Sequence, residues 1–380
     1  MSESTTHSDW RAYMSPAQPE DEHWMMFALE EAKKAIGVSA PNPSVGSVIV
    51  RDGEVLGSGH TQRVGGPHAE VMALRSAFEA MKDVTGATAY VTLEPCSHFG
   101  RTPPCADTLL KAGIGRVVAA TVDPNPQVAG RGLKRLAQHM PVTCGVCEAQ
   151  AMDINAGFIK RMKTGVPYVR LKSAMTLDGY TALPNGESKW ITGEAARADG
   201  RRWRARSGAV ITGIGTVLSD DPQMTARGAM GTLEPLRVVV DATLATPVNA
   251  RLFDSPGVII VCAHYDEARA SALRARGGEI WHCPSKANPD RVDLAKMLFE
   301  LGQIEINEVL VEAGLGLNSA FLSASLVDEL VIYQAPCFFA QGLPMARFPV
   351  PEAPGAAPRW TIKDITRVGE DQRILLGRTS

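Results

Sequence analysis

The chain has 380 residues, of which 45% are hydrophobic and 21% are charged, and its formal net charge is −2. This length and composition predict a globular protein of two or three domains, with two favoured. The near-neutral charge and the absence of a long Lys/Arg run argue against a nucleic-acid partner, and no stretch is apolar for the about 18 residues that a membrane span needs. Residues 1–20 are polar and lack the apolar core of a signal peptide, so we expect a flexible N-terminal tail on a cytoplasmic protein.

The first elements are predicted from residue 21 onward. Met25, Leu29 and Ala32 recur with helical spacing, and Gly37 suits the end of that helix. The predicted strands are 45–50, 55–60, 89–93 and 117–122, and further helices begin at 68 (marked by Val71, Leu74, Phe78 and Met81), at 105 and at 130. A hairpin turn at Arg51-Asp52-Gly53 joins the first two strands. This alternation predicts an α/β layered domain.

The composition changes at 155–166, where glycines and basic residues predict a linker after a short helix. A second α/β domain follows. Its predicted strands are 168–173, 209–213, 236–241, 257–262, 308–312 and 329–335, with helices that include 195–206 and 294–302. Residues 341–358 are rich in Pro and Ala and predict a loop, and a final strand pair is expected within 361–376.

The strongest chemical signal is His68-Ala69-Glu70, which is followed by Cys96 and Cys105. Zinc prefers tetrahedral His and Cys ligands, and a catalytic site keeps one position for water. His68, Cys96 and Cys105 fill three positions, and the metal would lower the pKa of a water in the fourth towards about 7. Glu70 stands at the start of a helix, where it can move a proton from that water to a leaving amine. These are the parts of a zinc-dependent deaminase.

The spacing of the two cysteines departs from the short P-C-x-x-C pattern of that class. Eight residues separate Cys96 from Cys105, and His98 between them is a rival ligand. The alternative is a structural Cys/His cluster without chemistry, which would leave Glu70 without a role.

Seven cysteines in a chain of this length do not indicate a disulfide framework. Cys144 and Cys147 form a C-x-x-C, which would suit a redox pair or half of a zinc site. Two ordinary thiols are favoured, because no second Cys or His pair lies near enough in sequence to complete such a site.

Several short motifs in the second domain place glycines between a strand and a helix. Gly213 and Gly215 follow one predicted strand, and Gly314 and Gly316 follow another. Backbone N–H groups can approach a phosphate at such positions, although each pair alone is more often a turn. Neither pair matches G-x-G-x-x-G in a first βαβ unit, so a Rossmann domain is not supported.

Arginines gather in the predicted helix 195–206. The helical spacing puts Arg197, Arg201 and Arg204 on one face, where a guanidinium suits a phosphorylated substrate. The alternative is a solvated basic face, which is favoured for Arg201 and Arg202 taken singly.

From about residue 22 the sequence resembles the family of bifunctional riboflavin-biosynthesis deaminase/reductases. The resemblance rests on Pro41-Asn42-Pro43-x-Val45-Gly46, His68-Ala69-Glu70, Glu94-Pro95-Cys96-Ser97-His98-x-Gly100-Arg101-Thr102-Pro103-Pro104-Cys105 and Asp123-Pro124-Asn125-Pro126. In that family the longer Cys-to-Cys spacing is the rule.

The resemblance implies a cytidine-deaminase-like α/β/α layered domain at 21–163, with Zn²⁺ at His68, Cys96 and Cys105 and with Glu70 as the proton shuttle. It also implies a dihydrofolate-reductase-like α/β domain at 164–380 that uses NADPH. Asn42 is an expected substrate contact, with a turn-forming Asn between prolines as an equally weighted alternative.

The same resemblance implies a set of contacts in the second domain. The implied cofactor contacts are Ala174, Trp190, Thr216, Asp220, Gly314, Leu315, Gly316, Leu317, Asn318, Ser319 and Ala320. The implied substrate contacts are Ser188, Arg204, Met224, Arg227 and Glu312. Lys172 and Asp178 are expected to line the same cleft, and we hypothesise that Asp178 or Glu312 assists opening of the ribose ring. Thr176 stands where Ser is usual and Ala313 where a second Gly is frequent.

The expected function is two consecutive steps towards riboflavin. The first is hydrolytic removal of the 2-amino group of a diaminopyrimidinone ribosylamine phosphate, and the second is reduction of the product's ribose to a ribityl chain. The expected partners are therefore small phosphorylated pyrimidines, and a homodimer or higher homo-oligomer is expected by analogy with the family. The alternatives are a nucleic-acid-editing deaminase, a zinc-stabilised interaction protein, and a chain in which one half is degenerate. The residues alone do not decide between NADPH and NADH, because no basic residue can be assigned to a 2′-phosphate.

Overall fold

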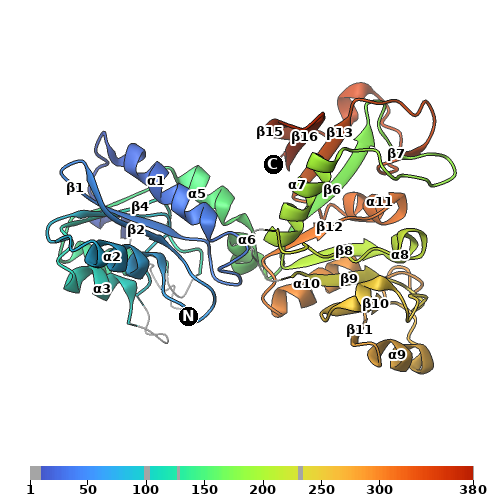
Figure 1. Cartoon of the computed structure of the whole chain (residues 1–380), viewed down its shortest axis with the longest axis horizontal. Coiled ribbons are helices and arrows are strands. Elements are labelled where there is room, and N and C mark those ends of the chain that lie inside the picture. Colours follow the sequence, from blue (N-terminus) through green and yellow to red (C-terminus); the bar gives the residue numbers. More distant parts are fainter. Residues whose placement is uncertain (1–9, 98–102, 126–128, 230–233, 380) are drawn as a thin grey trace, which may run out of the picture. The chain divides into compact units, whose positions relative to one another are not determined.

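The computed structural model describes residues 10–97, 103–125, 129–229 and 234–379. The chain divides into two compact units, Met1–Thr164 and Gly165–Ser380. Figure 1 shows both units coloured along the sequence. Among the described residues, no helix is both long and apolar enough to cross a membrane.

The first unit is built on a five-stranded sheet in the order β2-β1-β3-β4-β5. Its strands are β1 (Gly46–Arg51), β2 (Glu54–His60), β3 (Thr88–Val91), β4 (Arg116–Ala119) and β5 (Val142–Cys144). β1 runs antiparallel to both of its neighbours, whereas β3, β4 and β5 are parallel. The helices are α1 (Asp21–Lys34), α2 (Ala69–Glu79), α3 (Cys105–Lys111), α4 (Arg131–Ala137), α5 (Glu148–Ile154) and α6 (Ala156–Thr164), preceded by the 3-10 turn η1 (Trp10–Tyr13).

Alternate residues of each strand face opposite sides of this sheet, and both sides are covered. Ile49 and Ala89 pack with α2, α3 and α4 on one side, and Val48 and Tyr90 pack with α1 and α5 on the other (Figure 1). This period-two burial of both faces produces three layers. The expected α/β/α arrangement is confirmed.

Helix α2 packs through its small residues, and the large apolar side chains of Phe78 in its last turn and of Met81 just beyond its end point to solvent. Phe78 and Met81 are 82% and 93% exposed, although their spacing helped to predict the helix. The buried side is formed by Ala69, Ala73 and Ala77 together with Glu70. Opposite this side, β2 carries glycines, and a Cβ at Gly57 would lie 2.3 Å from the carbonyl oxygen of Ala73. The close approach of α2 to β2 requires small residues on both elements, which apolar periodicity does not detect.

The expected linker at 155–166 is wrong, because residues 156–164 form helix α6. Its basic residues stand at helical positions, and its glycine, Gly157, is buried. Between α5 and α6, the buried side chain of Asn155 accepts a hydrogen bond from the backbone N–H of Ser44 at 2.7 Å and donates one to its carbonyl at 2.9 Å. These long-range bonds fix the segment and are invisible to local composition.

The second unit is built on a nine-stranded sheet in the order β11-β10-β9-β8-β12-β6-β13-β16-β15. Its strands are β6 (Tyr168–Thr176), β8 (Ala209–Gly213), β9 (Leu236–Val240), β10 (Val258–Cys262), β11 (Gly278–His282), β12 (Glu308–Val311), β13 (Glu329–Ala335), β15 (Trp360–Val368) and β16 (Asp371–Arg378). The strands from β11 to β13 are parallel, and β16 and β15 add an antiparallel edge. β7 (Tyr180–Ala182) and β14 (Leu343–Pro344) form a separate pair.

Helices cover both faces of this sheet as well. α10 (Leu294–Gln303) and α11 (Leu315–Ser323) pack on one face around Leu171, Ile211 and Val311. The opposite face is covered by α7 (Glu194–Arg206), α8 (Ile214–Asp220) and α9 (Glu267–Arg274). The strands predicted in this unit are confirmed to within a few residues, whereas β7, β11 and β14 had not been predicted.

A buried ion pair joins α1 to β4 in the first unit. The Arg116 guanidinium donates to both carboxylate oxygens of Asp21 at 2.7 Å, and Tyr90 donates to the same carboxylate at 3.1 Å. Burial opposes ionisation of Asp21, but the hydrogen bonds from Arg116 and from the backbone of Gln18 outweigh it and hold the pKa of Asp21 below its usual value. The folded pKa lies below the unfolded one, so this stabilisation is complete above the unfolded pKa and is lost as the pH falls through the folded pKa.

Replacing Arg116 by Ala leaves the Asp21 carboxylate buried without its cation. We expect the free energy of unfolding of the first unit to fall by about 3–5 kcal/mol at neutral pH. Lys33→Ala, which removes an exposed pair with Glu30, should change it little. Denaturant unfolding of both full-length variants measures the difference, and equal losses would contradict a stabilising role for the buried pair.

Candidate active sites

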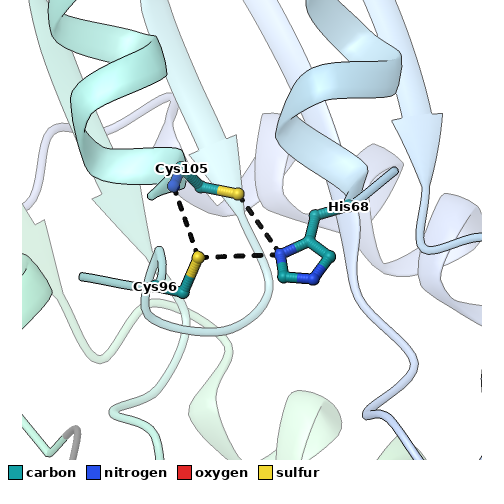
Figure 2. A group of neighbouring side chains, drawn as sticks. All are labelled: His68, Cys96 and Cys105. Atoms are coloured by element: carbon teal, nitrogen blue, oxygen red, sulfur yellow. Dashed lines mark hydrogen bonds between the residues drawn. The ribbon is translucent and has the colours of Figure 1, made fainter. Parts of the chain in front are cut away.

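Three side chains from separate segments meet in the first unit (Figure 2). His68 precedes α2, Cys96 lies beyond β3, and Cys105 is the first residue of α3. The Nδ1 atom of His68 lies 3.7 Å from Sγ of Cys96 and 3.3 Å from Sγ of Cys105. All three donor atoms lie within 4.8 Å of one another. One imidazole nitrogen and two sulfurs at this spacing suit a tetrahedral metal with one position left open.

Local sequence explains how these three residues reach one point. Pro104 stands immediately before α3, so the helix begins at Cys105. The backbone N–H of Cys105 donates to Sγ of Cys96 at 3.3 Å, which ties the two cysteine segments together. His68 is held by the glycine–alanine packing of α2 on β2.

The two thiols differ in acidity because they share hydrogen bonds. The hydrogen bond from the Cys105 thiol, followed by that from His68, lowers the pKa of Cys96 to about 4 although burial opposes this. For Cys105, the hydrogen bond that its thiol donates to Cys96, together with burial, raises the pKa above its usual value. The bond to Cys96 also raises the pKa of His68. A metal ion would replace these shared protons, because thiolate and neutral imidazole are the ligand forms.

Glu70 lies beside this cluster on the first turn of α2, and its side chain is 3% exposed. Burial, together with the negative charge of Cys96, raises the pKa of this carboxyl to about 7. A buried carboxyl that titrates near neutrality can both take and give a proton under physiological conditions.

Asn42 lies in the loop between α1 and β1, where hydrogen bonds among the described residues hold its backbone but not its side chain. The backbone N–H of Asn42 donates to the carbonyl of Ser39, and the Ser39 hydroxyl donates to the carbonyl of Asn42. Within the described part of the chain, the side-chain amide of Asn42 makes no hydrogen bond. That amide is available to a ligand.

The remaining metal-ligand predictions have mixed outcomes. The rival ligand His98, with the motif residues Gly100, Arg101 and Thr102, lies outside the described residues. Cys144 and Cys147 are free thiols. Where the structure is described, the only group of three or more metal-ligating side chains is that of His68, Cys96 and Cys105, so nothing there completes a second metal site around the C-x-x-C.

Glu94 has a role that the sequence did not reveal. Its carboxylate is 4% exposed, and burial raises its pKa although backbone donors oppose this. Its backbone donors, with their N···O distances, are Asp123 (3.1 Å), Gly130 (2.8 Å), Gly132 (2.7 Å) and Leu133 (3.4 Å). Glu94 therefore fixes the loop after β4 against the segment that carries Cys96. A Cβ at Gly132 would lie 2.0 Å from the carbonyl oxygen of Pro95. In the sequence, this glycine was the only sign that the two segments lie close together.

A cavity of about 1250 Å³ lies in the second unit. Most of the residues expected to contact cofactor or substrate line it. They are Lys172, Ala174, Ser188, Trp190, Arg204, Thr216, Asp220, Met224, Arg227, Glu312, Gly314, Leu315, Gly316, Leu317 and Ala320. Arg197 and Arg201 line it too, so one face of α7 borders the cavity, as the helical spacing of its arginines predicts.

Three of the expected residues do not line this cavity. The Asp178 carboxylate, expected to line the cleft with Lys172, instead accepts hydrogen bonds from the backbone N–H groups of Phe339 and Ala340 and is not among the lining residues. Asn318 is 1% exposed and donates to the carbonyl of Met345. Ser319 donates to the carbonyl of Leu315. The last two follow from helix geometry, since only one side of α11 can face the cavity.

Three charged side chains meet inside the cavity. Nε and Nη2 of Arg204 donate to the two carboxylate oxygens of Glu312 at 2.6 and 3.0 Å, and Nζ of Lys172 lies 4.0 Å from Oε2. Burial opposes ionisation of Glu312, but the positive charges of Arg204 and Lys172 lower its pKa to about 2. Burial lowers the pKa of Lys172, with a further contribution from Arg204 and opposition from Glu312.

Comparison with known proteins matches each unit to a protein family. Residues 18–121 match the family model described as "Cytidine and deoxycytidylate deaminase zinc-binding region", and residues 167–374 match "RibD C-terminal domain". The chain is 44% identical over 369 residues to "Riboflavin biosynthesis protein RibD" of Escherichia coli (strain K12), covering 93% of this chain and 98% of the relative. The same-named protein of Aquifex aeolicus is 39% identical, with 85% and 89% covered.

Solved structures agree with these relatives. RibD of Acinetobacter baumannii, form 1, superposes with a TM-score of 0.85 at 42% identity, covering 95% of this chain and 99% of that one. A diaminohydroxyphosphoribosylaminopyrimidine deaminase/5-amino-6-(5-phosphoribosylamino)uracil reductase of Thermotoga maritima superposes with a TM-score of 0.82 at 33% identity, covering 94% and 99%.

Proposed function

This chain belongs to the RibD family and is therefore a bifunctional deaminase and reductase of riboflavin biosynthesis, and we propose which residues carry out its two reactions. The enzyme uses Zn²⁺ and NADPH. It deaminates a diaminohydroxyphosphoribosylaminopyrimidine and then reduces the ribosyl group of 5-amino-6-(5-phosphoribosylamino)uracil to ribityl. We assign the first reaction to the cluster around His68 in the first unit and the second to the cavity of the second unit.

The donor set of the first unit fits zinc, since His68, Cys96 and Cys105 offer one nitrogen and two sulfurs within 4.8 Å. When bound, zinc lowers the pKa of a water ligand and so supplies a nucleophile at neutral pH. Glu70 takes the proton from the attacking water and delivers it to the leaving amine, which departs as ammonia. Burial favours the protonated form of Glu70 and so suits its acceptance of the proton from water. The free amide of Asn42 is the proposed contact to the pyrimidine.

The cavity of the second unit is large enough for a dinucleotide, and the glycines along it leave space for one. A Cβ at Gly215, Gly314 or Gly316 would meet no protein atom within 4 Å, so packing does not require glycine there and the space is left for a ligand. We propose that the cofactor contacts are Ala174, Trp190, Thr216, Asp220, Gly314 to Leu317 and Ala320. Asn318 and Ser319 would then support α11 from outside the cavity, as their hydrogen bonds to Met345 and Leu315 suggest.

When bound, NADPH supplies a hydride. The protein must open the ribose ring by protonating its ring oxygen, so that the first carbon can accept that hydride. Glu312 is a poor acid because its pKa of about 2 keeps it ionised, and Asp178 does not line the cavity. We therefore propose Lys172 as the proton donor, with Arg204 and Glu312 positioning it, and Ser188, Met224 and Arg227 as further substrate contacts.

The partners of the chain are small-molecule substrates. We further propose a cytoplasmic homodimer or higher homo-oligomer that binds neither nucleic acid nor membranes, which the net charge of −2 and the analogy with the family support. Sedimentation velocity of the full-length chain would show a single monomeric species if the proposed association were wrong.

Glu70→Gln removes the proton shuttle and keeps the zinc ligands. We expect ammonia release to fall by about 10²- to 10⁴-fold, while zinc content and the reduction of supplied 5-amino-6-(5-phosphoribosylamino)uracil stay at wild-type levels. Cys105→Ser is expected to lose zinc together with ammonia release, and Cys144→Ser to lose neither. Normal ammonia release by zinc-loaded Glu70→Gln would refute the assignment.

Lys172→Arg keeps a positive charge beside Glu312, but a guanidinium does not give up its proton at neutral pH. We expect the kcat of reduction to fall by about 10²-fold or more, with NADPH binding retained. If Lys172→Arg keeps NADPH binding but loses turnover, Lys172 acts as a proton donor and not only as a fixed positive charge. Asp178→Asn, outside the cavity, should keep most of the reductase activity. A wild-type kcat in Lys172→Arg would rule out the proposed donor.

A further inference from the structure

The cavity of the second unit follows the sheet from strand to strand. Its lining residues include Lys172 on β6, Glu312 after β12, Gly213 at the end of β8, and Val240 on β9. These four strands are neighbours in that order and are parallel. Since adjacent strands lie about 4.8 Å apart, the cavity crosses about 14 Å of sheet at the carboxyl ends of its strands. Ligands of open α/β sheets bind at such an edge.

This order gives the cavity two distinct ends. At β6 and β12 lie Lys172, Glu312 and Arg204, which under the proposed function face the substrate and the reacting end of the cofactor. In the middle, Gly314 and Gly316 border open space before and within the first turn of α11. The end at β9 is therefore left for the part of NADPH that is remote from the hydride, namely its adenosine.

The end at β9 carries two arginines. Arg251 lies in the 3-10 turn η3 (Arg251–Asp254), and Arg291 lies in the loop before α10; both line the cavity and both are exposed. Their backbones are anchored, because the N–H of Arg251 donates to Asp221 and the N–H of Arg291 donates to the carbonyl of Asn288. Among the described residues, neither guanidinium makes an ion pair or a hydrogen bond.

The acidic groups at this end have partners other than the two guanidinium groups. Asp241 follows β9, where an acidic residue in other dinucleotide sites holds a ribose hydroxyl and disfavours a 2′-phosphate. Here Asp241 is fully buried, does not line the cavity, and accepts hydrogen bonds from the backbone and hydroxyl of Thr246. Asp290 and Asp221 line the cavity. The Asp290 carboxylate lies 2.9 Å from Nε2 of His264, and the Asp221 carboxylate accepts a hydrogen bond from the backbone N–H of Arg251.

We infer that Arg251 and Arg291 bind the 2′-phosphate of NADPH and so select it over NADH. This inference rests on the proposed cofactor cavity and adds the residues that decide which nicotinamide cofactor fills it. Guanidinium groups suit phosphate because they offer several charged donors in one plane. The two arginines belong to separate segments, after β9 and before α10, so they can approach the phosphate from two sides.

The test measures binding to the full-length chain rather than turnover. In Arg251→Gln/Arg291→Gln, the Kd of NADPH is expected to rise by at least about tenfold, while the Kd of NADH stays at its wild-type value. Adenosine 2′,5′-bisphosphate should lose affinity in parallel, and adenosine 5′-monophosphate should not. The matched control is Arg276→Gln/Arg359→Gln, which removes the same charge at two exposed positions outside the cavity and should leave all four affinities unchanged.

The outcomes separate this inference from the function on which it rests. If the wild-type chain fails to bind NADPH, the cofactor cavity itself is wrong. If the wild-type chain binds NADPH and the double variant binds it equally well, the cavity stands and the role of the two arginines is refuted. Equal losses for NADPH and NADH would also refute it, because they would show damage to the cavity rather than loss of phosphate recognition.

Discussion

Both sites depend on parallel strand pairing, which brings the carboxyl ends of neighbouring strands to one edge. In the first unit, β3 and β4 are parallel, so the segment with Cys96 and the loop beginning at Asp123 leave the sheet side by side. The Glu94 carboxylate then binds backbone N–H groups of that loop. In the second unit, the same constraint brings Lys172 on β6 next to Glu312 beyond β12, although they are 140 positions apart in the sequence.

The parts of the molecule that could be predicted from the sequence are those whose determinants are local. The metal cluster was predictable because His68, Cys96 and Cys105 each stand next to a helix start or a strand end, and zinc chemistry restricts the residue types. The strands of the second unit were predictable because runs such as Val258–Cys262 are apolar and mostly β-branched. The arginine face of α7 followed from helical spacing alone.

The features that were missed depend on contacts between distant segments. Phe78 and Met81 mark a helix, but α2 faces the sheet with its alanines, because only small residues allow the approach to Gly57. Helix α6 resembles a linker in composition, and the hydrogen bonds of Asn155 to Ser44 that anchor its start join residues 111 positions apart. Asp178 was expected in the cleft from its place in a motif, yet backbone donors at Phe339 and Ala340 hold its carboxylate outside the cavity lining.

The contrast between Glu70 and Glu312 shows how one residue type acquires two roles. Both carboxyls are largely withdrawn from water, which by itself favours the neutral form. Glu312 receives two charged hydrogen bonds from Arg204 and the field of Lys172, so its pKa falls to about 2 and it serves as a fixed negative charge. At Glu70, burial and the negative charge of the Cys96 thiolate outweigh the opposing effect of His68, and the pKa rises to about 7. Environments that shift the pKa values of two carboxyls in opposite directions fit one carboxyl for a structural role and the other for proton transfer. In the cavity of the second unit, Lys172 is the group that can release a proton, because burial lowers its pKa although the charge of Glu312 opposes this.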